Sequence, residues 1–269
     1  MKFEVKGLVI HETPLKDNDR FLDILTEKYG RISVYGRGVR SYKSKNMAST
    51  MPMTYSDFIL DRQKDNFIVL CEADKIESYG DPTIGLEVNA LCMYVCDVIR
   101  EFALPEQDSS GLLRLALNTL YASTHKLYEQ DLIKASFELR IMSDEGFMPD
   151  LSCCGTCYCS VNDNFYLDVM NGCLICGDCL AERSEDYVER TGTSSIICPL
   201  SLNSVSAMNY IITAPLNRLF SFNLTDKQNI IELYNATQTY LINQLEKNYP
   251  TLDFFNQVRE LLNKSKEKS

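Results

Sequence analysis

The part of the sequence best suited to chemistry is a run of cysteines between positions 153 and 179. These 27 positions hold seven of the eleven cysteines of the 269-residue chain. Eighteen residues separate two Cys-x2-Cys pairs, which are Cys154/Cys157 and Cys176/Cys179. This spacing is typical of four-cysteine zinc sites, in which thiolates satisfy a tetrahedral ion without a preformed core. The pattern therefore predicts a bound zinc ion.

Spacing alone leaves the choice of ligands open. Cys173 and Cys176 form a further Cys-x2-Cys pair, and Cys153 or Cys159 could replace a ligand of the first pair. A catalytic zinc needs an open position and a nearby base, and both histidines of the chain lie far from the cysteines in sequence. The residues therefore favour a closed, structural site.

Cysteines at this spacing also occur in sites other than zinc sites. A redox Cys-x-x-Cys normally begins a helix within a βαβ unit, and no such pattern surrounds these residues. An iron–sulfur cluster takes the same ligands and stays open as an alternative. The odd number of cysteines and an N-terminus without an apolar signal segment predict a reducing, cytoplasmic location. A disulfide framework is not expected there.

A second candidate site is a basic run near the N-terminus. The net charge is −10, yet residues 1–56 hold ten basic and six acidic residues. Tyr35 and Tyr42 are interleaved with the basic residues of interest, which are Arg31, Arg37, Arg40, Lys43 and Lys45. Basic groups that follow phosphates and rings that stack on bases are typical of single-strand binding. The segment predicts a nucleic-acid contact, although such a loop alone also fits a solvated surface.

Two kinds of element must position these residues. Five short β-rich runs separated by turn residues fill the first eighty positions and predict a small five-stranded barrel. Further along, apolar residues recur at three- and four-residue spacing, which predicts helices over 88–102, 108–127, 129–145 and 226–248. We therefore expect an α+β protein with four parts: a barrel over 1–80, helices over 81–150, a zinc-binding module over 151–182 and further helices over 183–269.

Three segments in a fixed order carry a resemblance to a known family. They are the N-terminal stretch from GLVIHET to GRGVR, the stretch FELR to EGFMPDLS, and the paired cysteine motifs. Together they resemble the RecO family of bacterial recombination mediators. That family's Gly-Gly-x-x-Cys-x2-Cys step falls on residues 172–179, with Gly172 as the first glycine and Cys173 in place of the second. The resemblance implies metal ligands at Cys154, Cys157, Cys176 and Cys179.

The resemblance also implies a fold and a function. The barrel would be an oligonucleotide-binding (OB) fold, followed by an all-helical domain that carries the structural zinc module. The protein would be no enzyme but a DNA repair mediator, which binds single- and double-stranded DNA and anneals complementary strands. With RecR it would assist RecA loading on DNA coated by single-stranded DNA-binding protein (SSB). Its partners would then be DNA, RecR, SSB and indirectly RecA, in the cytoplasm and at the nucleoid during repair, with no membrane.

Two other functions fit the residues. One is a zinc-ribbon scaffold or regulatory protein whose barrel binds RNA or protein and which does not anneal strands. The other is a zinc-dependent hydrolase, which would need an open metal site and chelator-sensitive cleavage. The sequence shows neither a phosphate-cradling glycine loop nor a nucleophile–base pair, which favours a binding function.

Overall fold

A computed structural model describes residues 1–15, 18–160, 162, 164–182 and 196–266. The chain forms two compact units. Met1–Leu127 and Tyr249–Ser269 form the first, and Tyr128–Asn248 form the second. No helix of the described residues combines the length and the apolar character that a membrane crossing requires.

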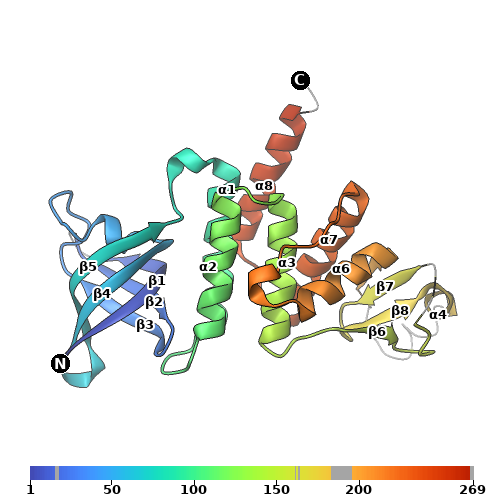
Figure 1. The fold of residues 1–269 in the computed structure, drawn as a ribbon, viewed down its shortest axis with the longest axis horizontal. Coiled ribbons are helices and arrows are strands. Elements are labelled where there is room, and N and C mark those ends of the chain that lie inside the picture. The colour runs from blue at the N-terminus through green and yellow to red at the C-terminus, as the bar shows by residue number, and fades with distance from the viewer. Residues whose placement is uncertain (16–17, 161, 163, 183–195, 267–269) are drawn as a thin grey trace. The chain divides into compact units, whose positions relative to one another are not determined.

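The first unit opens with a closed barrel of five strands (Figure 1). The strands are β1 (Lys2–Pro14), β2 (Arg20–Thr26), β3 (Gly30–Gly36), β4 (Thr54–Arg62) and β5 (Ile68–Ser78). Their order around the barrel is β1-β2-β3-β5-β4, in which β3 and β5 are parallel and the other neighbours are antiparallel. This is the arrangement of the OB fold. Each β-rich run of the sequence becomes one of these strands, so the predicted barrel is confirmed.

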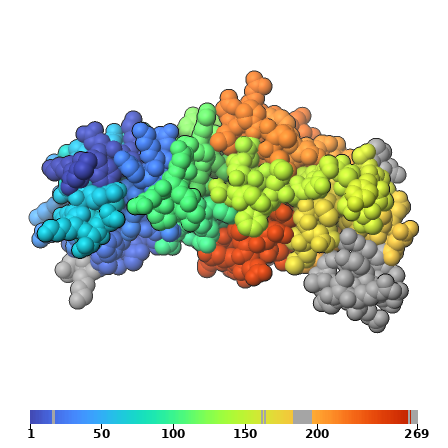
Figure 2. Space-filling view, turned by 90° about the horizontal axis from the view of Figure 1, so that it is seen from below, coloured from blue at the N-terminus to red at the C-terminus, as the bar shows by residue number. Residues whose placement is uncertain are grey.

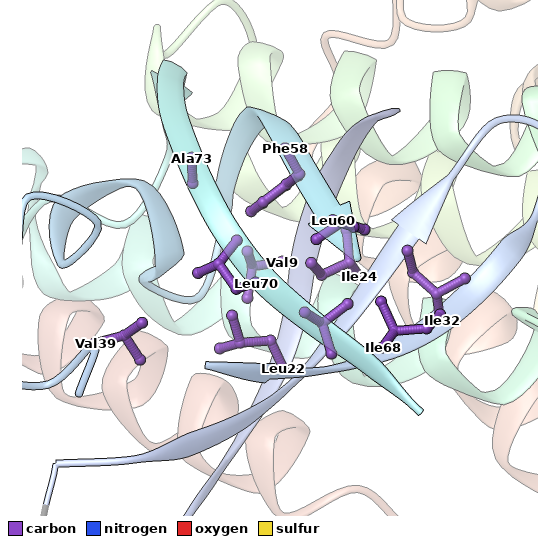
Figure 3. Packing of buried hydrophobic residues seen from close by; sticks show 11 residues of the cluster. Val9, Leu22, Ile24, Ile32, Val39, Phe58, Leu60, Ile68, Leu70 and Ala73 are labelled. Atoms are coloured by element: carbon purple, nitrogen blue, oxygen red, sulfur yellow. The ribbon is translucent and has the colours of Figure 1, made fainter. Parts of the chain in front are cut away.

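Strand alternation gives the barrel both its core and its outer surface. On β3, Ile32 and Val34 are buried in the barrel, while Arg31, Ser33 and Tyr35 are more exposed. Successive side chains of a strand point to opposite faces, so the same residues that fill the core fix which side chains face outward. Figure 3 shows the packed interior, which is built from Val9, Leu22, Ile24, Ile32, Val34, Val39, Phe58, Leu60, Ile68, Leu70 and Ala73.

Three helices complete the first unit: α1 (Leu86–Phe102), α2 (Ser110–Thr124) and α8 (Pro250–Lys266). Helix α1 contacts α2, α8 and strand β1. In Figure 2 the green segment that follows the barrel lies against the blue residues of the barrel. Thr251 donates a 2.8 Å hydrogen bond to Asp97, and the rings of Tyr94 and Tyr249 meet edge to face at 5.8 Å. These contacts join the C-terminal helix to α1.

The turn between β2 and β3 is bound to the chain that follows α1. The amide of Arg31 donates to the carbonyl of Leu104 at 3.2 Å, and that of Glu106 donates to Tyr29 at 3.0 Å. Gly30 makes this approach feasible. Its φ is +60°, and a Cβ there would lie 2.0 Å from the Leu104 carbonyl oxygen. Any other residue would push the two segments apart.

Among the residues that the structure describes, the second unit combines three long helices with a small sheet. Helices α3 (Gln130–Asp144), α6 (Leu202–Thr213) and α7 (Lys227–Gln244) contact one another. The sheet has the order β6-β8-β7-β9. Its strands are β6 (Asp150–Cys154), β7 (Phe165–Asp168), β8 (Cys173–Cys176) and β9 (Ile197–Leu200), and the short helix α4 (Gly177–Glu182) follows β8. Short 3-10 turns lie elsewhere in the chain at Ala48–Thr50, Lys64–Asn66, Pro82–Ile84 and Leu216–Arg218.

A buried ion pair lies between α3 and α7. Lys134 Nζ is 2.8 Å from Glu138 Oε1, and both side chains have no exposed surface. Thr237 on α7 donates to Glu138 at 2.8 Å, and Lys134 Nζ lies 3.8 Å from the ring centroid of Tyr234. Buried charges are tolerated only when they are paired and hydrogen-bonded in this way.

Candidate metal centre and nucleic-acid interface

The structure brings four of the seven clustered cysteines together. Cys154 ends β6, Cys157 lies in the turn that follows, Cys176 ends β8 and Cys179 lies in α4. All four sulfurs lie within 4.8 Å of one another, and those of Cys157 and Cys176 are 3.7 Å apart. A tetrahedral zinc ion with Zn–S distances of about 2.3 Å requires sulfurs about 3.8 Å apart. The four-cysteine cluster therefore fits a metal ion such as zinc.

Backbone amides favour the thiolate form of two cysteines of the cluster, which is the form that binds a metal cation. Burial opposes ionisation of Cys154, but amides of Cys157, Cys176 and Thr156 outweigh burial and lower its pKa to about 6. The pKa of Cys157 is also lowered, chiefly by the amide of Cys159. The pKa of Cys179 is raised because its thiol hydrogen-bonds to Cys157. A bound divalent cation reverses that effect, because coordinating thiols lose their protons.

The other three cysteines of the run lie beside the cluster. Cys159 hydrogen-bonds to Cys157, which raises the pKa of Cys159 to about 12. Ser152 Oγ lies 3.7 Å from the sulfur of Cys153, and the sulfur of Cys173 packs against Gly155. Among the described residues, the grouped sulfurs are thus those that the family resemblance implied, and the alternatives from spacing lie outside the group.

Gly172 allows the sheet that holds the cluster to approach helix α7 closely. Its φ is +62°, and a Cβ there would lie 2.9 Å from the hydroxyl of Tyr240 on α7. That hydroxyl donates to the carbonyl of Phe147 at 3.0 Å, and Gly172 accepts a 2.7 Å bond from the Asp150 amide. Gln244 of α7 also donates to Val169 at 2.7 Å. The sheet that holds the sulfurs is therefore fixed to α7.

The predicted basic residues separate into two places. Four of them are exposed in residues 37–45, which follow β3 and which we call the basic turn; they are Arg37, Arg40, Lys43 and Lys45. Arg31 instead lies at the other end of β3, half-buried, and donates to the carbonyl of Arg100 at 3.3 Å. Lys45 Nζ is 3.5 Å from Glu72, and both side chains are largely exposed.

Asp19 fastens the basic turn to the loop between β1 and β2. Its carboxylate accepts hydrogen bonds from the hydroxyl of Tyr35 and, at 2.6 Å, from the amide of Gly38. These two bonds hold the pKa of Asp19 below its ordinary value, with the larger effect from Tyr35 and the smaller from Gly38. Nearby Arg37 acts in the same direction. The Arg40 amide also donates to Asn18 at 2.9 Å. The turn is thereby held against the barrel.

Three aromatic rings lie together on the outside of the barrel near the basic turn. Phe21 of β2 pairs across the strands with Tyr35 of β3, with ring centroids 5.6 Å apart. Phe67, just before β5, lies 5.7 Å from Tyr35 and 6.3 Å from Phe21, and is 41% exposed. We call these rings the aromatic trio. Of these three rings the sequence pointed only to Tyr35, although Phe21 occupies an outward position of the alternating β2 pattern. Tyr42, the other ring that the sequence indicated, lies in the basic turn and is exposed.

Fold and cluster define a class of protein in which an OB-fold barrel is followed by helices and a four-cysteine cluster. Two family models match the chain: Recombination protein O N terminal over residues 1–79 and Recombination protein O C terminal over residues 85–253. The chain therefore belongs to the RecO family of DNA repair and recombination proteins, which are non-catalytic recombination mediators. The family expectation from the sequence is confirmed.

Relatives match over almost their whole length. The chain is 32% identical to DNA repair protein RecO of Acetivibrio thermocellus, over 93% of this chain and 95% of that protein. It is 25% identical to DNA repair protein RecO of Clostridium acetobutylicum, over 96% and 98%. The DNA repair protein RecO of Caldicellulosiruptor saccharolyticus is also 25% identical, over 96% and 100%.

Proposed function

We propose that this protein binds single- and double-stranded DNA through its barrel and anneals complementary strands. The observation that carries the proposal is the aromatic trio, in which Phe67 is exposed and Phe21 and Tyr35 are half-buried, beside a cationic turn on the outer face of β2 and β3. Such a surface supplies both the stacking and the phosphate neutralisation that single strands require. No bond of the DNA needs to be made or broken, which agrees with the non-catalytic character of the family.

The trio occupies the face that OB folds use for oligonucleotides. That face consists of the second and third strands with the loops that join the first two strands and the last two. Here Phe21 and Tyr35 come from β2 and β3, Phe67 from the connection between β4 and β5, and Asp19 from the connection between β1 and β2. Each base stacked on such a ring contributes about 1–3 kcal/mol.

The basic turn supplies a local excess of positive charge in a protein whose net charge is −10. Arg37, Arg40 and Lys43 are exposed, and Lys45 pairs only with an exposed glutamate across 3.5 Å, a type of pair that contributes about 0–1 kcal/mol. A phosphate can therefore replace that partner at little cost. Salt screens charges beyond roughly 10 Å, so the acidic remainder of the chain does not cancel the local field.

We also propose that the four-cysteine cluster binds a structural zinc ion. Ligands Cys154, Cys157, Cys176 and Cys179 would close all four positions and leave none for water, which suits a structural site. Zinc would link β6, β8 and α4, whose strands are too short to be stable alone. The zinc supplies folding energy, and the DNA contact lies on the barrel.

The partners follow from the family. We propose that the protein works with RecR on DNA coated by SSB and so assists RecA loading. Support comes from the two family matches, which together cover nearly the whole chain. The acidic remainder of the chain, which carries −14 outside residues 1–56, is the surface expected to meet protein partners.

Fluorescence anisotropy with a labelled oligothymidylate tests the DNA contact. The double variant Arg37→Glu/Arg40→Glu should lower affinity at low salt and flatten the plot of log K against log salt by about 0.7 per lost phosphate contact. Phe67→Ala should lower affinity by about 1–3 kcal/mol. Lys6→Glu, an exposed charge on β1, is the matched control. Unchanged affinity in both barrel-face variants would refute the proposed interface.

A further inference from the structure

A cavity of about 650 Å³ lies within the first unit, beside the turn between β2 and β3. Barrel residues such as Tyr29, Arg31 and Ile68 line it on one side, and Arg100 and Pro105 at the end of α1 line it on the other. We call it the turn cavity. Its size is in the range of pockets that bind small organic ligands. Neither the cluster nor the proposed DNA contact at the basic turn uses it.

The charges around the turn cavity favour an anion. The lining holds four basic residues and two acidic ones. One acidic residue, Asp23, is compensated because Arg100 Nε lies 3.0 Å from its carboxylate. Glu106 is the other. The lining therefore carries a formal excess of two positive charges.

Three of the basic side chains that line the turn cavity are available to bind an anion. Arg31 donates to a neutral carbonyl, that of Arg100, and Arg62 lies 5.6 Å from the ring centroid of Phe3. Lys28 is exposed at the turn. Among the described residues, no carboxylate forms an ion pair with Lys28, Arg31 or Arg62. These groups are free to bind phosphate oxygens, and the side chain of Tyr29, 37% exposed, offers a ring beside them.

The turn cavity lies at the end of the proposed DNA path. From Gly36 to Arg31, β3 spans five residue steps, or about 17 Å, and its outward residues lead from the basic turn past Tyr35 to the cavity. At that end β3 meets the chain that follows α1. The chain after α1 is hydrogen-bonded to the β2–β3 turn, through Glu106 to Tyr29 at 3.0 Å and Ser109 to Glu27 at 2.8 Å. A strand laid along β3 would meet this segment at the turn cavity.

From this arrangement we infer that the turn cavity binds the terminal nucleotide of a DNA single strand. Its phosphate lies between Arg31, Arg62 and Lys28, and its base packs against Tyr29 and Pro105. The inference rests on the proposed function, since it requires a single strand on the outer face of β2 and β3. It adds that the protein distinguishes a strand end from the interior of a strand, which a purely electrostatic surface does not do.

Comparison of linear and circular single strands tests this inference. The probes are a linear oligothymidylate and its covalently closed circle, equal in length and longer than the roughly 4–16 nucleotides that one OB fold contacts. Binding to the full-length protein is measured by competition. The variants are Lys28→Gln and Lys28→Gln/Arg62→Gln, with Lys6→Gln as the matched control, and the thermal midpoint of each reports folding. The single Lys28 variant, at an exposed turn, is retained if the double variant is destabilised.

We expect the double variant to lose at least about tenfold in affinity for the linear strand, since two charge-assisted contacts disappear, and to bind the circle as the parent protein does. Equal losses for both probes would overturn the inference, because the cavity charges would then act only as a general field. Unchanged binding of both probes would also overturn it. In either case Arg37→Glu/Arg40→Glu should still weaken binding. If the parent protein binds neither probe, the proposed function itself fails.

Discussion

At the scale of single residues, spacing predicted the cluster better than it predicted the DNA surface. The two cysteines of a Cys-x2-Cys pair are close in sequence, so each pair brings two sulfurs to one place, and two such pairs at this spacing are typical of a four-cysteine site. Spacing did not distinguish Cys173 from the grouped cysteines, because the pairing of β6 with β8 decides which sulfurs of the two strands come together. The orientation of Arg31 and the approach of Phe67 to Tyr35 depend on the closed barrel, which no local pattern encodes.

Replacement of single cysteines tests the cluster. Cys176→Ser removes a buried sulfur of the group, so we expect the protein to lose bound zinc and more than about 4 kcal/mol of unfolding free energy. Cys173→Ser is the matched control, because its sulfur lies outside the group, and it should retain both. Mass spectrometry of the intact protein reports the metal, and chemical denaturation reports stability. If Cys173→Ser loses the metal and Cys176→Ser keeps it, Cys173 is a ligand and the proposed ligand set is wrong. If the bound metal is iron, the site holds an iron–sulfur cluster and no zinc.

At the scale of elements, periodicity predicted what is long and regular. The strands of the barrel and helices α1, α2, α3 and α7 all follow from repeated apolar positions. The sheet β6-β8-β7-β9 was not predicted, because strands of four or five residues in a cysteine-rich segment have no measurable period. The association of α8 with α1 also escaped prediction, since Thr251 and Asp97 are 154 positions apart in the sequence.

The contact between the β2–β3 turn and the chain after α1 gives a prediction about two glycines. Gly30 and Gly38 both have positive φ, but only at Gly30 would a Cβ collide with backbone. Gly38→Ala should therefore cost about 1–2 kcal/mol of unfolding free energy. Gly30→Ala should cost about 2 kcal/mol more, because two backbone hydrogen bonds of about 1 kcal/mol each are lost with it. Equal costs in chemical denaturation would contradict the close approach.

The buried ion pair gives a second prediction at this scale. Lys134→Met leaves Glu138 without its cation, so we expect it to destabilise the protein by about 3–5 kcal/mol. The double variant Lys134→Met/Glu138→Leu removes both charges and should recover most of that loss. A double-mutant cycle by denaturation measures the coupling. Additive losses would show that the two side chains do not depend on each other.

At the scale of the whole molecule, the protein separates two tasks along its chain. The barrel carries a cationic and aromatic surface, and the four-cysteine cluster lies more than a hundred residues later, in a sheet that contacts α7. Composition predicted this poorly, because a net charge of −10 argues against DNA binding when it is taken as an average. The local excess in residues 1–56 was the informative quantity, and its meaning became specific only with the family match.

Strand annealing tests the central claim most directly. Two complementary oligonucleotides, one with a donor and one with an acceptor fluorophore, are mixed with and without SSB, and the rate of energy transfer is measured. We expect the protein to accelerate annealing of bare and SSB-coated strands, and Arg37→Glu/Arg40→Glu to bring the rate close to the spontaneous one. Lys6→Glu should anneal as the parent protein does. A parent protein that binds DNA, RNA or protein but leaves annealing at the spontaneous rate would contradict the account.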